Sequence, residues 1–339
     1  MNMDTEPAFD VSGIGNAIMD ILIEIDDDEL SNLGLKKGNF HLMDEKEAKS
    51  LLRNLKGLKS ALSPGGSGAN TVYGVSVLGG RAAFSGKVGS DDYGAIYESE
   101  TAKSGVKATF SRHETIPTGY AITFITPDKE RTFAVYTGAA ATMEERDINV
   151  GDIGRSSIFH VEGYMLEDRR MRDVSIYAIE QAKRSGAKIS VDLGDPGIVS
   201  RNRDVLVSLV EKYADIVFAN EPESMHFSMM EGEKAAEYIA GLAGIGIVKL
   251  GAKGSIVRSG KETYRIMPFA SGVVDTTGAG DMYAAGFLYG FSNGYGLDVC
   301  GTLGSYFASK VIGKMGARLN SVEKSDFDSA LASTRMNRT

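Results

Sequence analysis

Short apolar segments alternate with longer, charge-bearing segments through the middle of this chain. The apolar segments have the length and composition of strands, whereas a stretch such as 169–185 has the character of a surface helix. Consecutive parallel strands need a crossover connection, so this alternation predicts a mostly parallel sheet with helices on both faces. The fold class is therefore expected to be α/β. The strands are predicted at 158–161, 188–191, 216–218 and 245–250.

Two pairs of apolar segments break this rhythm. The first pair is 21–25 with 40–43, and the second is 119–125 with 131–136. The second pair alternates in hydrophobicity and is separated by a Pro-Asp turn at 126–129, which predicts a β-hairpin.

A glycine-rich segment at 275–281 reads Asp-Thr-Thr-Gly-Ala-Gly-Asp and is followed directly by the apolar run 282–290. Such a turn leads into a helix whose first N–H groups are unpaired and whose dipole is positive at that end, so it can bind an anion. Asp281 would place a carboxylate where a phosphoryl group and a hydroxyl group meet. The alternative is an ordinary helix start with Asp281 as its N-cap.

The segment 275–281 resembles the second signature of the PfkB carbohydrate-kinase family, the ribokinase-like sugar and nucleoside kinases. The first signature of that family resembles 64–70, Pro-Gly-Gly-Ser-Gly-Ala-Asn, with the later glycine segments 79–80 and 86–89. Val72 departs from the pattern, because the family usually carries Ser, Thr or Ala there. This departure concerns helix packing more than chemistry.

The resemblance extends from about residue 9 to about residue 320. It implies one ribokinase-like α/β kinase domain over 1–339, with a central, mostly parallel sheet flanked by helices. It also implies a small β-sheet lid over the substrate, inserted at about 16–45 and 113–140.

The same resemblance implies roles in phosphoryl transfer. Asp281 would accept the proton of a primary hydroxyl group, while the amides of Gly278, Ala279 and Gly280 would hold the γ-phosphoryl oxygens. The residues implied in binding the acceptor are Asn16, Asp20, Gly65, Gly66 and Asn70, with Arg131 and Phe133 on the lid. The alternatives are an exposed strand position for Asp20, a surface position for Arg131 and simple lid packing for Phe133.

For the nucleotide, the resemblance implies ATP with Mg²⁺. Asn220 and Glu223 match an Asn-x-x-Glu motif that organises Mg²⁺ and the phosphates through water. Asp275 and the Thr277 carbonyl match a site for a monovalent cation such as K⁺. The loop under the phosphates and ribose would contain Lys249, Gly251 and Gly254.

Composition and charge limit the kinds of partner that this chain is expected to bind. The net charge is −8 and no Lys/Arg cluster stands out, which argues against a nucleic-acid surface. The single cysteine, Cys300, excludes an intrachain disulfide, and the histidines have no metal-ligand spacing. No apolar run approaches the roughly 18 residues needed to span a bilayer, and residues 1–7 lack the apolar core of a signal peptide. A cytoplasmic protein without a membrane or nucleic-acid partner is expected, as a monomer or as a homodimer through the lid.

The acceptor is the open question at this point. Ser67, where ribokinases tend to carry Lys, and the segment 160–164 resemble the adenosine-kinase-like branch, which favours adenosine and a role in purine salvage. An apolar slot for a purine is predicted from Ile18, Phe40, Met43 and Phe133. A sugar such as ribose or fructose is the alternative acceptor, and a catalytically idle sugar- or nucleoside-binding regulator is the alternative function. The segments that would indicate a P-loop NTPase, a protein kinase or a dinucleotide fingerprint are absent from the sequence.

Overall fold

The structure, a computed structural model, describes residues 7–55, 57, 60–128 and 130–336. Residues 1–6, on which most of the expectation about the amino terminus rests, and Lys129 of the predicted hairpin turn lie outside these ranges. Within them, every helix is too short or too polar to cross a lipid bilayer.

The larger of two sheets confirms the predicted α/β class. Neighbouring strands of this sheet pair in parallel except at one edge. There the last two strands of the chain are joined as a hairpin, and the first of them also pairs antiparallel with its other neighbour. The strands predicted from the apolar segments form its centre. In spatial order the nine strands are β14 (Glu262–Ile266), β13 (Ser255–Ser259), β12 (Ile245–Lys249), β11 (Ile216–Asn220), β10 (Lys188–Asp192), β9 (Ser156–Glu162), β1 (Phe9–Ile14), β5 (Ala82–Gly89) and β6 (Lys107–His113).

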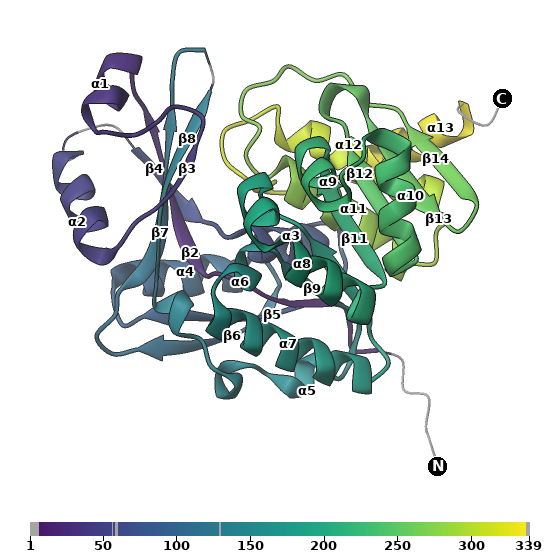
Figure 1. Cartoon of the computed structure of the whole chain (residues 1–339), viewed down its shortest axis with the longest axis horizontal. Helices are drawn as coiled ribbons and strands as arrows, with labels where there is room; N and C mark the ends of the chain where they lie inside the picture. Colours follow the sequence, from purple (N-terminus) through teal and green to yellow (C-terminus); the bar gives the residue numbers. More distant parts are fainter. Residues whose placement is uncertain (1–6, 56, 58–59, 129, 337–339) are drawn as a thin grey trace.

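Helices cover both faces of this sheet (Figure 1). On β11, Ile216 and Phe218 pack into one core while Val217 and Ala219 pack into the other, as the alternation of side chains along a strand requires. The first core is covered by α3 (Ser67–Val77), α4 (Asp92–Lys103), α11 (Ala279–Ser292), α12 (Leu297–Val311) and α13 (Lys324–Met336). The second is covered by α5 (Val150–Ile153), α6 (Tyr164–Glu167), α7 (Arg169–Arg184), α8 (Pro196–Tyr213), α9 (Glu221–Ser228) and α10 (Gly232–Ala243).

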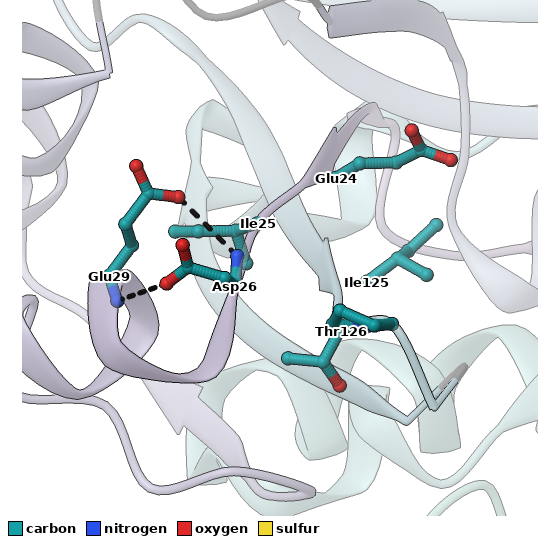
Figure 2. A pocket seen from close by; sticks show the side chains of 7 residues that line it. Glu24, Ile25, Asp26, Glu29, Ile125 and Thr126 are labelled. Atoms are coloured by element: carbon teal, nitrogen blue, oxygen red, sulfur yellow. Dashed lines mark hydrogen bonds between the residues drawn. The ribbon is translucent and has the colours of Figure 1, made fainter.

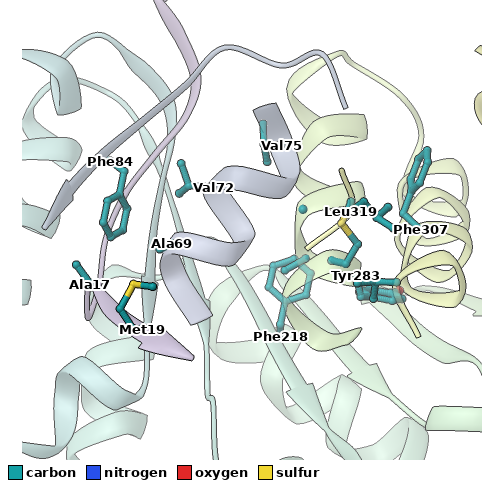
Figure 3. Packing of buried hydrophobic residues seen from close by; sticks show 14 of the residues in the cluster. Ala17, Met19, Ala69, Val72, Val75, Phe84, Phe218, Tyr283, Phe307 and Leu319 are labelled. Atoms are coloured by element: carbon teal, nitrogen blue, oxygen red, sulfur yellow. The ribbon is translucent and has the colours of Figure 1, made fainter. Parts of the chain in front are cut away.

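Helix α3 packs between the larger sheet and α11. Its buried side chains Ala69, Val72 and Val75 lie in one cluster with Phe84 of β5 and with Tyr283 of α11 (Figure 3). Val72, the departure from the family signature, is fully buried in this cluster, which agrees with a packing role.

A second, five-stranded sheet stands beside the first, at the upper left of Figure 1. The predicted hairpin is present, with β7 (Thr118–Ile125) antiparallel to β8 (Arg131–Gly138). Helices α1 (Asp27–Asn32) and α2 (Glu45–Asn54) contribute the buried side chains of Leu30 and Leu51. These pack in one cluster with Ile21 and Ile23 of β2 (Ile18–Glu24). In spatial order the strands are β3 (Phe40–Leu42), β8 (Arg131–Gly138), β7 (Thr118–Ile125), β2 (Ile18–Glu24) and β4 (Ser60–Pro64).

Strand β4 was not predicted and lies beyond the segment 16–45 that the sequence suggested. Its residues are mostly exposed and have no apolar alternation, so the hydrophobic pattern gave no signal. Short 3₁₀ helices complete the chain: η1 (Ala139–Thr142), η2 (Glu145–Asp147) and η3 (Gly251–Lys253).

Candidate active site

Polar side chains gather at the carboxyl ends of adjacent parallel strands. Along the chain, the sheet grows in one direction from β1 to β6 and then in the other from β9 to β12, so the order reverses between β1 and β9. Ligands of open α/β sheets bind at such a reversal. The residues at these strand ends are Asn16, just after β1, Glu162 of β9, Asp192 of β10, Asn220 of β11 and Lys249 of β12.

Glu162 ties together the two segments predicted to bind the acceptor. Its side chain is 1% exposed and accepts hydrogen bonds from the backbone N–H of Asn16 (3.3 Å) and of Gly68 (2.5 Å). Burial raises the pKa of this carboxyl group to about 7, and the two N–H donors oppose that rise.

The glycine-rich turn leads directly into α11, as predicted. Gly278 is the N-cap with φ of 75°, and a Cβ there would also collide with the carbonyl oxygen of Ala317, so glycine is required. Asp281 lies in the first turn of the helix. The alternative interpretation, in which Asp281 is the N-cap, is therefore wrong, because Gly278 occupies that position.

Two side chains of α3 hold the Asp281 carboxylate. The Ser67 hydroxyl donates to Oδ1 (2.8 Å) and Asn70 Nδ2 donates to Oδ2 (3.0 Å). Burial raises the pKa of Asp281, and these two donors oppose the rise by stabilising the charged form. The carboxylate is thus oriented toward the segment predicted to bind the acceptor.

Asp20 lies close to this carboxylate, on β2. It is 9% exposed, so the exposed-strand alternative is wrong. Gly65 approaches it so closely that a Cβ at Gly65 would overlap the Asp20 carboxylate. Burial raises the pKa of Asp20 to about 7; the positive charge of Arg318 opposes this rise and the charge of Asp281 adds to it.

Asn70 was expected to bind the acceptor, and both ends of its side-chain amide already have a partner within the protein. Nδ2 binds Asp281, and Oδ1 accepts from Nε of Arg318 (2.8 Å). The guanidinium of Arg318 also lies over the ring of Tyr73, 4.7 Å from its centroid. Asn70 therefore connects the predicted base to a positive charge beside Asp20.

One face of the smaller sheet presents apolar side chains next to Asp20. Ile18, on the same face of β2, clusters with the half-buried rings of Phe40 and Phe133. The centroid of the Phe40 ring lies 5.9 Å from that of Tyr164 of α6. This face therefore contacts one of the helices that cover the larger sheet. Met43 is not part of this face, because it packs into the first core instead.

Arg131, at the start of β8, reaches from the smaller sheet to the glycine-rich turn. Its guanidinium forms an ion pair with Asp275 and donates to the hydroxyl of Thr276. Arg131 is 9% exposed, so the surface alternative is wrong. The carboxylate predicted for a monovalent cation is therefore already paired with a positive charge, and the residues do not fit an additional K⁺ at Asp275.

Lys249 lies beside the start of α11. Its ammonium is 3.2 Å from the point where a Cβ on Gly280 would lie, and it forms an ion pair with Asp192 (2.8 Å). Burial opposes the charged form, but Asp192 and Glu223 raise the pKa of Lys249 above its ordinary value. A permanent positive charge thus lies next to the predicted phosphoryl site, which fits the phosphates of ATP.

Asn220 and Glu223 form a capping box at the start of α9. The Glu223 carboxylate is 2% exposed and accepts from both the N–H (2.7 Å) and the side-chain amide (2.6 Å) of Asn220. Burial raises its pKa to about 7. This geometry is that of a helix cap, and the role of Glu223 in organising Mg²⁺ through water stays a prediction.

Of the other predicted nucleotide residues, Gly251 is the first residue of η3 and Gly254 is its C-cap, and both have positive φ. Thr277 donates its backbone N–H to Asp275 (2.7 Å). His160 is buried beside Ser190 (3.0 Å between Nδ1 and Oγ), and Cys300 is buried, as expected for structural residues. The described residues contain no group of three or more His, Cys, Asp or Glu side chains that could hold a metal ion.

A surface hollow of about 340 Å³ lies elsewhere, where β2 and β7 end (Figure 2). It is lined by Glu24, Ile25, Asp26, Glu29 and Ile125, among others. In the capping box of α1, the side chains of Asp26 and Glu29 each accept a hydrogen bond from the backbone N–H of the other residue. This hollow carries no chemistry related to the site above.

The sequence interpretation missed Glu162, Asp192 and Arg318. Glu162 and Asp192 each directly follow an apolar strand that was predicted, and a carboxylate at that place was a usable signal. Arg318 lies in an irregular segment far along the chain and gave none.

The comparisons with known proteins agree with this geometry. Residues 44–324 match the pfkB family carbohydrate kinase domain. A solved adenosine kinase from Sinorhizobium meliloti is 34% identical, with a TM-score of 0.89 over 96% of this chain and 99% of that one. Among curated relatives, an uncharacterized sugar kinase from Archaeoglobus fulgidus is 31% identical, over 72% of this chain and 96% of its own length. A 5-dehydro-2-deoxygluconokinase from Bacillus subtilis is 29% identical, over 74% and 81%.

The fold and the site define a kinase that acts on a hydroxyl group. The chain belongs to the PfkB family of carbohydrate kinases. It is a sugar or nucleoside kinase with the ribokinase-like fold, and kinases of this family use ATP, generally with Mg²⁺.

Proposed function

We propose that this kinase transfers the γ-phosphoryl group of ATP to the 5′-hydroxyl group of adenosine or a close purine nucleoside. The observation that carries the proposal is the face of the smaller sheet, where Ile18, Phe40 and Phe133 lie beside Asp20. A purine needs apolar and aromatic contact, while its ribose needs a carboxylate for its hydroxyl groups. The similarity to the Sinorhizobium meliloti adenosine kinase supports the same acceptor.

The chemical step follows from charge and position. Asp281 accepts the proton of the acceptor hydroxyl, while the amides at the start of α11 stabilise the phosphoryl oxygens. Lys249 adds a positive charge beside Gly280. Mg²⁺, when bound with ATP, neutralises charge on the phosphates.

A sugar kinase is the second candidate, and one observation favours it. Arg318 places a guanidinium next to Asn70 and Asp20, where an acceptor bearing a carboxylate would be bound well. Sugar kinases are also among the relatives. An idle binding protein is less consistent with Asp281, whose carboxylate is held by two donors.

Further parts of the proposal concern the cellular setting. A nucleoside kinase of this kind would serve purine salvage in the cytoplasm. The smaller sheet acts as a lid over the acceptor, since its apolar face meets α6. Both a monomer and a dimer through this sheet are compatible with that lid.

The test measures ADP release with ATP, Mg²⁺ and one acceptor at a time: adenosine, inosine, ribose, fructose or a sugar acid. The proposal predicts that kcat/KM for adenosine exceeds that for ribose by at least about fivefold, because a stacked base contact is worth about 1–3 kcal/mol. If kcat/KM is higher for a sugar or a sugar acid than for adenosine, that compound is the acceptor and the adenosine proposal is wrong. ADP release with none of them would favour the binding protein.

A further inference from the structure

The ion pair between Arg131 and Asp275 joins the two sheets at the turn before α11. Arg131 is the first residue of β8 in the smaller sheet, whereas Asp275 opens the glycine-rich segment. Asp275 is 0% exposed and Arg131 is 9% exposed, so both charges are withdrawn from water. A buried carboxylate without a positive partner is strongly destabilising, so the partner of Asp275 matters for the order of this turn.

Asp275 also accepts two backbone hydrogen bonds. Oδ1 accepts from the N–H of Thr277 (2.7 Å) and Oδ2 accepts from the N–H of Gly316 (2.8 Å). The carboxylate thereby ties the turn to the segment after α12. A metal cation at Asp275 would have to displace the guanidinium, because two cations on one buried carboxylate repel each other.

Arg131 also fixes the turn through a second contact. One terminal nitrogen of its guanidinium binds Asp275 while the other donates to the hydroxyl of Thr276. Arginine suits such a task because its planar group makes several hydrogen bonds in a fixed geometry and keeps its charge when buried.

We propose that the guanidinium of Arg131 takes the place of a monovalent cation at Asp275, so that the turn before α11 needs no K⁺ to be ordered. The charge is part of the chain and cannot dissociate. Activity and stability are therefore independent of K⁺ in the wild type, whichever acceptor the enzyme uses.

The first experiment measures the thermal midpoint of the ligand-free wild type in KCl, NaCl or choline chloride at equal ionic strength. This readout needs no acceptor, so it is separate from the test of the proposed function. The midpoint should agree in the three salts within about 1 °C. An ion that bound the native state at ten times its Kd would raise it by roughly 2 °C. A rise specific to KCl, or a K⁺ requirement for ADP release, would overturn the proposal.

The second experiment uses Arg131→Met, which keeps an unbranched chain and removes the charge. Asp275 then lacks a partner, and K⁺ should bind it, so KCl should raise the midpoint by roughly 2 °C over choline chloride. Arg112→Met is the matched control, because Arg112 forms an exposed ion pair with Glu98 away from the site.

Arg131→Lys keeps the charge and should remain independent of K⁺, which preserves the test if the Met variant does not fold. A Met variant with the same midpoint in all salts, or a Lys variant that responds to K⁺ as strongly as the Met variant, would contradict the substitution of arginine for the ion.

Discussion

Arg318 and Asn70, 248 positions apart in the sequence, are joined by a 2.8 Å hydrogen bond from Nε to Oδ1. This bond fixes the orientation of the Asn70 amide, so that Nδ2 is the group that donates to Asp281. An arginine that no sequence signature contains thereby positions the predicted base.

Replacing Arg318 should change the pH dependence of the reaction as well as its rate. Arg318→Met frees the Asn70 amide to turn, and Asp281 then loses a donor that stabilises its charged form. The pKa of Asp281, already raised by burial, should rise further, so activity should fall off at a higher pH on the acid side. The rate should fall roughly 10- to 100-fold, since a hydrogen bond to a charged group contributes about 1.5–3 kcal/mol.

The measurement is kcat/KM as a function of pH for the wild type and for Arg318→Met. Arg318→Lys serves as a comparison that keeps the charge without the Nε bond. An unchanged acid limb in the Met variant would show that Arg318 acts through charge or packing alone.

Acceptor binding should weaken as the pH falls through about 7, because Asp20 has a pKa of about 7 and must be ionised to accept hydrogen bonds from ribose hydroxyl groups. In Asp20→Asn, KM for the acceptor should be high and independent of pH, while KM for ATP should stay close to that of the wild type. If KM of the wild type is flat from about pH 6 to 8, Asp20 does not bind the acceptor in its ionised form.

The same residue should make folding less favourable at high pH. Its pKa in the unfolded chain is near 3.8 and burial raises it to about 7, so the folded state binds the proton more tightly. The stability associated with this proton is present below pH 3.8 and is lost as the pH rises through about 7. Asp20→Asn should therefore be more stable than the wild type at about pH 8, by at most about 4 kcal/mol. Urea denaturation at high and low pH measures this difference, which should shrink toward zero in acid.

Phe133→Ala should weaken the binding of adenosine by about 1–3 kcal/mol, which is the range for the loss of one base–aromatic contact. Any residual use of ribose should barely change. Phe9→Ala is the matched control, because Phe9 begins β1 at the opposite end of that strand from Asn16 and packs beneath Lys107 and Arg155. Equal losses for both acceptors would mean that Phe133 only packs the lid.

The sequence predicted those parts of the fold whose pattern is local. The strands at 158–161 and 188–191 appear as β9 and β10, since buried parallel strands leave a clear apolar run. Edge strands such as β4 and β14 leave no such run, because much of their surface is exposed. The turn before α11 was predictable because an anion site needs small residues at a helix start.

The rest of the site depends on contacts between distant segments. Asn70 was identified, but its bond to Arg318 joins segments that no local pattern connects. Likewise, Arg131 was expected on the lid, yet its pairing with Asp275 could not be read from either segment alone.

The most direct test of the central claim is a single-turnover measurement of phosphoryl transfer to adenosine by Asp281→Asn. Asp298→Asn is the matched control, because Asp298 is likewise an aspartate in the first turn of a helix, α12. We predict that Asp281→Asn lowers the rate of transfer by about 10²–10⁴, the usual contribution of a general base, and leaves adenosine affinity within a few-fold. A rate above roughly a third of that of the wild type would contradict the assignment of Asp281 as the base.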